Sequence, residues 1–114
     1  MARTLLLLLF AAILLGMIVV TVTASLDTSI WEVPSTLTSD PWFWATLADA
    51  YFGFITFYVW VAYREATSAA RVIWFVAIMA LGNIAMSVYM LIRLWLWQPS
   101  QGVEALLLRS NASQ

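Results

Sequence analysis

The sequence predicts an all-α integral membrane protein with three transmembrane helices. Of the 114 residues, 64% are hydrophobic and 10% are charged, and the mean hydropathy is +0.92. A soluble domain of this size could not bury so much apolar surface. The chain also contains three apolar stretches of the length, about 20 residues, that a helix needs to cross the roughly 30 Å hydrocarbon core of a bilayer. These stretches are residues 5–24, 42–63 and 72–97.

The first predicted helix is the uninterrupted apolar run 5–24, LLLLLFAAILLGMIVVTVTA. A cleaved signal peptide is the competing interpretation, because Arg3 supplies a charged start and Val22-Thr23-Ala24 resembles a cleavage site. The run is longer than the roughly 7–15 residues of a typical signal sequence, so a retained helix is favoured. Ala12 and Gly16 form a pair of small residues that would let another helix approach closely.

The second predicted helix, 42–63, follows a polar and acidic link. Asp40 can cap its start, and Pro41 fits the first helical position, where the missing N–H has no cost. The connection to the next helix, REATSAAR (64–71), is short. The second and third helices are therefore expected to form an antiparallel hairpin.

The third predicted helix is continuous over 72–97 and stops before Pro99. Residues 1–97 would then form one three-helix transmembrane domain. Residues 98–114 would form a short tail outside the membrane, with a short amphipathic helix at 103–109.

The arginines set the expected orientation. Arg3 precedes the first helix and Arg64 and Arg71 flank the second connection, whereas the 25–41 link carries acids and no basic residue. The positive-inside rule then places the N-terminus and the 64–71 connection in the cytoplasm and the C-terminus outside. We expect the bacterial inner (cytoplasmic) membrane as the location.

Polar and small residues follow one face of the second and third helices at alternating spacings of four and three residues. The residues singled out on or beside these faces are Asp49, Gly53 and Thr56 in the second helix and Gly82, Asn83 and Arg93 in the third. Their faces are expected to meet, with Gly53 and Gly82 allowing close helix packing.

Two intramembrane polar pairs follow from this register. With Trp42 and Trp97 taken as the outer ends, Thr56 and Asn83 fall in one layer, and Asp49 lies about 4.5 Å along the axis from Arg93. Asp49 would therefore pair with Arg93, or with a neighbour of it such as Tyr89. Two other interpretations stay open, namely a functional ionisable site and a partner subunit that satisfies the carboxylate.

Tryptophans mark the expected membrane interfaces, since indole rings concentrate at the level of the lipid headgroups. The proposed interfacial anchors are Trp42, Trp44, Trp95 and Trp97.

Several function classes are excluded by composition. The sequence has no Cys and no His, which removes thiolate and histidine metal sites and histidine acid–base catalysis. No nucleophile–base pair or glycine-rich phosphate loop is present either, so an enzyme is not expected. The net charge of −1 provides no basic patch for nucleic acid.

Two stretches, LADAYFGFITFYVWVAYRE (47–65) and LGNIAMSVYMLIRL (81–94), resemble a small family of uncharacterised membrane proteins of bacteria and plants that is described only as a domain of unknown function. The resemblance covers residues 1–97 and leaves out the tail. It implies a three-helix membrane domain and no particular activity. The positions that match the recurring pattern of the family are Asp49, Tyr51, Gly53, Gly82 and Asn83.

The leading functional hypothesis is a non-catalytic accessory subunit of a larger membrane protein complex. An energy-converting host, photosynthetic or respiratory, is expected, with no cofactor of the chain's own but with contact to lipids and to partner-bound pigment or quinone. The alternative is a small homo-oligomeric transporter or channel with Asp49 and Asn83 as its polar lining. A third hypothesis, a small-molecule or quinone binder, would require an open pocket near Trp60 or Trp95.

Overall fold

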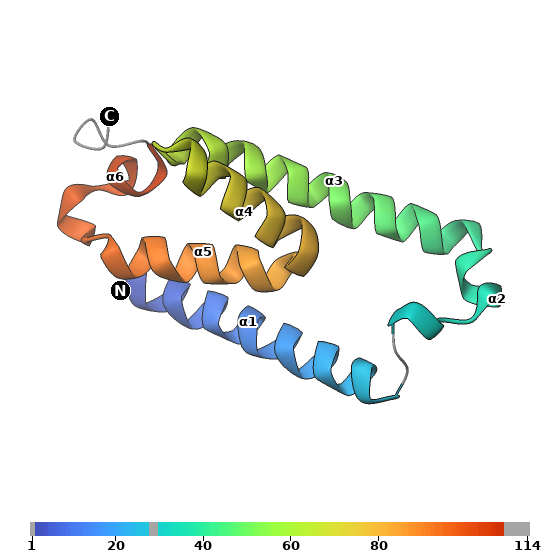
Figure 1. Cartoon of the computed structure of the whole chain (residues 1–114). Helices are drawn as coiled ribbons and strands as arrows, with labels where there is room; N and C mark the ends of the chain where they lie inside the picture. Colours follow the sequence, from blue (N-terminus) through green and yellow to red (C-terminus); the bar gives the residue numbers. More distant parts are fainter. Residues whose placement is uncertain (1, 28–29, 109–114) are drawn as a thin grey trace.

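The computed structural model describes residues 2–27 and 30–108, and every regular element within these ranges is helical. The molecule is elongated, with principal extents of 52 × 29 × 22 Å. Figure 1 shows two long helices with a shorter helical pair between them. The elements are α1 (Ala2–Asp27), η1 (Ile30–Glu32), α2 (Ser35–Thr38), α3 (Pro41–Arg64), α4 (Ser68–Leu81), α5 (Asn83–Leu96), η2 (Pro99–Gln101) and α6 (Val103–Leu107).

The two long helices correspond to the first two predicted spans. α1 has 26 residues and α3 has 24, and both are long and apolar enough to cross a membrane. At a rise of 1.5 Å per residue they are about 39 and 36 Å long, more than the roughly 30 Å of hydrocarbon. The start of α3 is the predicted one, because the Asp40 side chain accepts a hydrogen bond of 2.9 Å from the Trp42 N–H and Pro41 occupies the first turn.

The prediction of a continuous third span over 72–97 is wrong. The segment consists of two 14-residue helices, α4 and α5, that meet at Gly82. Each is about 21 Å long, which is too short to cross a bilayer. In Figure 1 the chain reverses at this point, so that α5 returns toward the end of the molecule where α4 began.

Gly82 is the physical reason for the reversal. Its φ of +53° lies in a region that residues with a Cβ rarely adopt. A Cβ built at this position would also lie 2.5 Å from Cζ of Phe54 in α3. The predicted close packing at Gly82 is therefore present, but at a turn between two helices and not along the face of one.

The helices pack in the order α1, α5, α4, α3. α4 runs antiparallel to α3, so the predicted hairpin is present as far as residue 81 (Figure 1). α5 lies along α1 instead. One buried cluster joins α3, α4 and α5 through Val61, Ile78, Ala85 and Tyr89. A second joins Leu94, Trp97 and Leu106, with partly buried side chains of α1 packed against it.

Both clusters lie toward one end of the molecule, which we call the basic end and define by Arg3, Arg64, Arg71 and Arg93. The opposite end, formed by the last turns of α1, by α2 and by the first turns of α3, is the open end (Figure 1). α1 contributes no fully buried residue, and α3 contributes Val61 alone.

Candidate functional site

The predicted Asp49–Arg93 pair is not formed. Arg93 lies at the basic end, where its Nη2 is 3.5 Å from Oε2 of Glu65. Asp49 lies near the open end, about 15 residues or roughly 22 Å before the last residue of α3. Arg93 would lie near Asp49 only if residues 72–97 formed one straight helix, but the reversal at Gly82 carries Arg93 to the opposite end.

Asp49 is exposed on α3, and within the described ranges its carboxylate forms no hydrogen bond or ion pair. Tyr89, named as a possible neighbour of Asp49, bonds to Glu65 instead. A carboxylate in the apolar part of a candidate span thus has no partner in the part of the chain that the structure describes.

The predicted Thr56–Asn83 hydrogen bond is also absent. The Thr56 hydroxyl donates to the Phe52 carbonyl in its own helix at 2.9 Å. Threonine hydroxyls in helices commonly donate to the carbonyl four residues earlier. Asn83 is exposed at the first position of α5, beside the turn.

The small residues other than Gly82 lie on open faces. Gly16 in α1 and Gly53 in α3 have no atom within 4 Å of where a Cβ would be, and Ala12 is exposed. Within this chain, these three residues do not bring two helices together.

The four proposed tryptophan anchors divide into two groups. Trp42, Trp44 and Trp95 are exposed near helix ends, as an interfacial role requires. Trp97 is different, because its exposed fraction is 8% and its indole N–H donates to the Gly102 carbonyl at 2.9 Å. Trp97 therefore belongs to the packing of the basic end.

Three arginines at the basic end each bind the last carbonyls of a helix other than their own. Arg3 Nε donates to the Leu94 carbonyl of α5 at 2.9 Å. Arg64 Nε donates to the Leu106 carbonyl of α6 at 2.9 Å. The last carbonyls of a helix lack intrahelical donors and form the negative end of its dipole, so a guanidinium group satisfies both needs.

Arg71 completes this set, since its Nε donates to the Ala62 carbonyl of α3 at 2.9 Å and to the Glu65 carbonyl at 3.1 Å. The sequence placed these arginines near helix ends but gave no indication of which carbonyls they bind, because the partners lie up to 94 residues away in the chain. Sequence reasoning treated them as signals of orientation alone.

Arg93 has different partners and belongs to a partly buried polar cluster, with Tyr89 and Glu65, that the sequence did not reveal. The Tyr89 side chain is fully buried, and its hydroxyl donates to Oε2 of Glu65 at 2.8 Å. The Arg93 guanidinium lies over the Tyr89 ring, 5.2 Å from its centroid. Edge-on contacts from other rings enclose Tyr89, and these rings belong to Phe57, Trp60 and Trp74.

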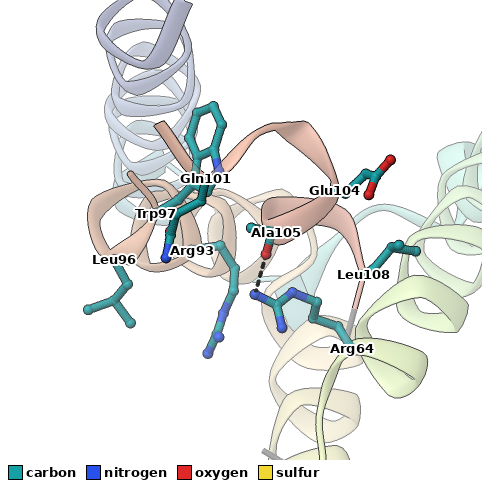
Figure 2. A pocket seen from close by; sticks show the side chains of 8 residues that line it. All are labelled: Arg64, Arg93, Leu96, Trp97, Gln101, Glu104, Ala105 and Leu108. Carbon is teal, nitrogen blue, oxygen red and sulfur yellow. Dashed lines mark hydrogen bonds between the residues drawn. The ribbon is translucent and has the colours of Figure 1, made fainter. Parts of the chain in front are cut away.

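A pocket of about 420 Å³ opens next to this cluster. Figure 2 shows Arg64 and Arg93 entering it from α3 and α5, with the Arg64–Ala105 hydrogen bond drawn between α3 and α6. The Glu104 carboxylate points away from both arginines in this view. The pocket thus presents two cationic side chains, and its chemistry favours an anion.

No acidic metal site accompanies these arginines, because the described residues hold no group of three Asp or Glu side chains that could bind a metal ion.

The comparisons with known proteins gave one match. Neither a search of curated proteins nor a search of solved structures found a significant match. A family model described as "Protein of unknown function (DUF1475)" matches residues 2–113. The match extends through the tail, which the resemblance in the sequence had left out. The chain therefore belongs to the DUF1475 family of proteins of unknown function.

Proposed function

We propose that this protein is a non-catalytic accessory subunit of a larger membrane protein complex, anchored by α1 and α3. The observation that carries the proposal is Asp49, a carboxylate that has no partner among residues 2–27 and 30–108 and lies in a helix long and apolar enough to span a bilayer. In hydrocarbon such a group is costly unless another chain answers its charge. A donor on a partner helix would do so.

The depth of Asp49 supports this role. It lies about 8 residues, or roughly 12 Å, from the start of α3. If the 24-residue helix is centred in the membrane, only about 3 Å of each end extends beyond the roughly 30 Å of hydrocarbon. Asp49 would then lie about 9 Å inside the edge of the hydrocarbon core, too deep for its short side chain to reach the headgroups.

The small residues also indicate that the face of α3 that carries Asp49 contacts a partner helix. Gly53 lies one turn from Asp49, on the same face of α3, and has open space beside it. In membranes, small residues next to a polar group are typical of helix–helix contacts. Gly16 offers a second open site on α1.

The proposed location is the bacterial inner membrane, with the basic end in the cytoplasm. This assignment keeps the N-terminus inside. It moves residue 97 and α6 to the cytoplasmic side as well, because Arg3 contacts the Trp97 carbonyl and Arg64 contacts the Leu106 carbonyl. The expectation that the tail lies outside does not fit these contacts. An energy-converting host, photosynthetic or respiratory, remains part of the proposal.

Mild extraction with mass spectrometry of bound proteins tests the proposal. Gly53→Trp should release the partners, because it fills the face beside Asp49. Ile55→Trp is the matched control, since it places the same indole at another exposed position about 200° around α3. Recovery of the wild-type chain as a lone monodisperse species, or equal behaviour of the two variants, would contradict the proposal.

The alternative, a small homo-oligomeric transporter or channel lined by Asp49 and Asn83, gains support from the reversal at Gly82. Helices that break part-way across a membrane commonly line ion or substrate paths, and Asn83 is exposed at this break. Ion flux in liposomes that contain the purified protein tests the idea. Asp49→Asn should abolish the flux, and the absence of any wild-type flux would exclude this function.

A further inference from the structure

We infer that the pocket between α3, α5 and α6 binds the phosphate group of an anionic phospholipid, with Arg93 as its principal ligand. This inference concerns the basic end and does not depend on the identity of any protein partner.

Arg93 differs from the other arginines of the basic end because, in the described part of the chain, no hydrogen bond to a helix-end carbonyl engages its Nε. Its Nε is buried and has no hydrogen-bond partner within the described residues. The Arg93 side chain as a whole lines the pocket and is 22% exposed, so an anion in the pocket would meet the guanidinium through its accessible side, while Nε stays behind it. The Arg93–Glu65 ion pair is long at 3.5 Å, compared with about 2.7–2.9 Å for a strong charge-assisted bond.

Glu65 lies beside the pocket but does not line it. Its Oε2 accepts the Tyr89 hydroxyl and faces Arg93, so this carboxylate competes with a bound anion for the Arg93 guanidinium. Arg64 adds a second cation whose Nε and Nη2 are occupied by α6 carbonyls. The charged residues that line the pocket are Arg64, Arg93 and Glu104, and in Figure 2 the Glu104 carboxylate points away from both arginines. The lining therefore carries net positive charge.

Size and surroundings favour a lipid over a free ion. The volume of about 420 Å³ is within the range of small-ligand sites and exceeds the needs of a lone phosphate. Leu96 and Leu108 line the pocket and are 66% and 49% exposed. They offer an apolar path for acyl chains, while Gln101 and the two arginines meet the headgroup.

Three probes separate the possible sources of the anion. Phosphatidylglycerol has both a phosphodiester and acyl chains, diacylglycerol has the chains alone, and inorganic phosphate has the anion alone. Binding of the two lipids to the detergent-solubilised full chain is measured by native mass spectrometry, and binding of phosphate by calorimetry. We expect binding of phosphatidylglycerol well above that of diacylglycerol. Tight binding of inorganic phosphate would overturn the lipid assignment in favour of a soluble ligand.

Variants test the role of Arg93. Arg93→Gln should weaken phosphatidylglycerol binding at least about ten-fold, the effect of losing a charge-assisted hydrogen bond. Arg93→Lys should weaken it less, because it keeps the positive charge and loses only the planar guanidinium donors. Glu65→Gln should strengthen binding, since it removes the competing carboxylate and leaves an acceptor for Tyr89.

Arg3→Gln is the matched control, because it removes the same charge at the same end but does not line this pocket. Thermal unfolding of each variant separates loss of binding from loss of fold. Equal losses in Arg3→Gln and Arg93→Gln, or weaker binding in Glu65→Gln with the fold intact, would overturn the inference.

Discussion

The basic end and the open end of this protein differ in how their polar groups are satisfied. At the basic end, three arginines bind the carbonyls that end α3, α5 and α6, and Tyr89 shares a carboxylate with Arg93. Nearer the open end, the Asp49 side chain is exposed and forms no hydrogen bond or ion pair within the described residues, and Gly16 and Gly53 leave open space beside the middle of α1 and α3. One end is thus stabilised from within, while the other retains groups that a second molecule would have to satisfy.

Replacing one large aromatic residue at each end by alanine should give the largest difference in unfolding free energy between the two ends. Tyr89→Ala removes a fully buried ring and should cost about 3–5 kcal/mol of unfolding free energy. Trp42→Ala removes a ring that is 79% exposed and should change stability by less than about 0.5 kcal/mol. Denaturation in detergent micelles, followed by far-UV circular dichroism, measures both. Similar losses would remove the distinction between the ends.

Two glycine-to-valine variants should give the next largest difference in stability, because only one of the two glycines is in a tightly packed turn. Gly82→Val forces a β-branched residue into a positive φ and against Phe54, so a loss of about 1–3 kcal/mol is expected. Gly16→Val has open space around it and should be tolerated by the isolated chain.

Cysteine labelling tests the reversal at Gly82 directly. Because the chain has no native cysteine, a single Ser100→Cys substitution allows labelling from either side of a sealed vesicle. In the wild-type background the label should react from the side of the N-terminus. Reaction from the opposite side would mean that α4 and α5 form one continuous span and would refute the reversal.

The smallest effect is expected for the helix-end contacts. Arg3→Gln removes the guanidinium from the carbonyls of Leu94 and Trp97 and should cost about 0.5–2 kcal/mol. Arg3→Lys should recover part of this loss, because the charge remains at the end of α5. The melting temperatures of the two variants in micelles provide the measurement, and a fully stable Arg3→Gln would show that the contact contributes nothing.

Helix positions and helix ends that depend on residues close together in the sequence could be predicted. The apolar run of α1, the Asp40–Pro41 start of α3 and the interruption before Pro99 are local signals, and each appears in the structure. The sequence was not sufficient for Gly82. A glycine inside an apolar helix is compatible with close packing or with a turn, and the choice depends on Phe54, a residue of another helix.

The unrecognised turn at Gly82 is the reason why most of the predicted residue pairs at the candidate site were wrong. The pairing of Asp49 with Arg93 and of Thr56 with Asn83 relied on counting along a straight helix, and a reversal changes every layer beyond it. The cluster of Glu65, Tyr89 and Arg93 arises from the same reversal, which brings α5 back beside the end of α3. Without the turn, no spacing in the sequence would place these three residues together.

The reversal at Gly82 also gives the molecule an uneven cross-section. If α1 and α3 cross a bilayer as proposed, four helices fill the leaflet at the basic end, because α4 and α5 are only about 21 Å long. Near the other leaflet's surface, two helices remain, and the space between them must be filled by acyl chains or by a neighbouring protein. Such a wedge would displace more lipid from one leaflet than from the other, so that the protein would favour membrane regions that curve to match its shape.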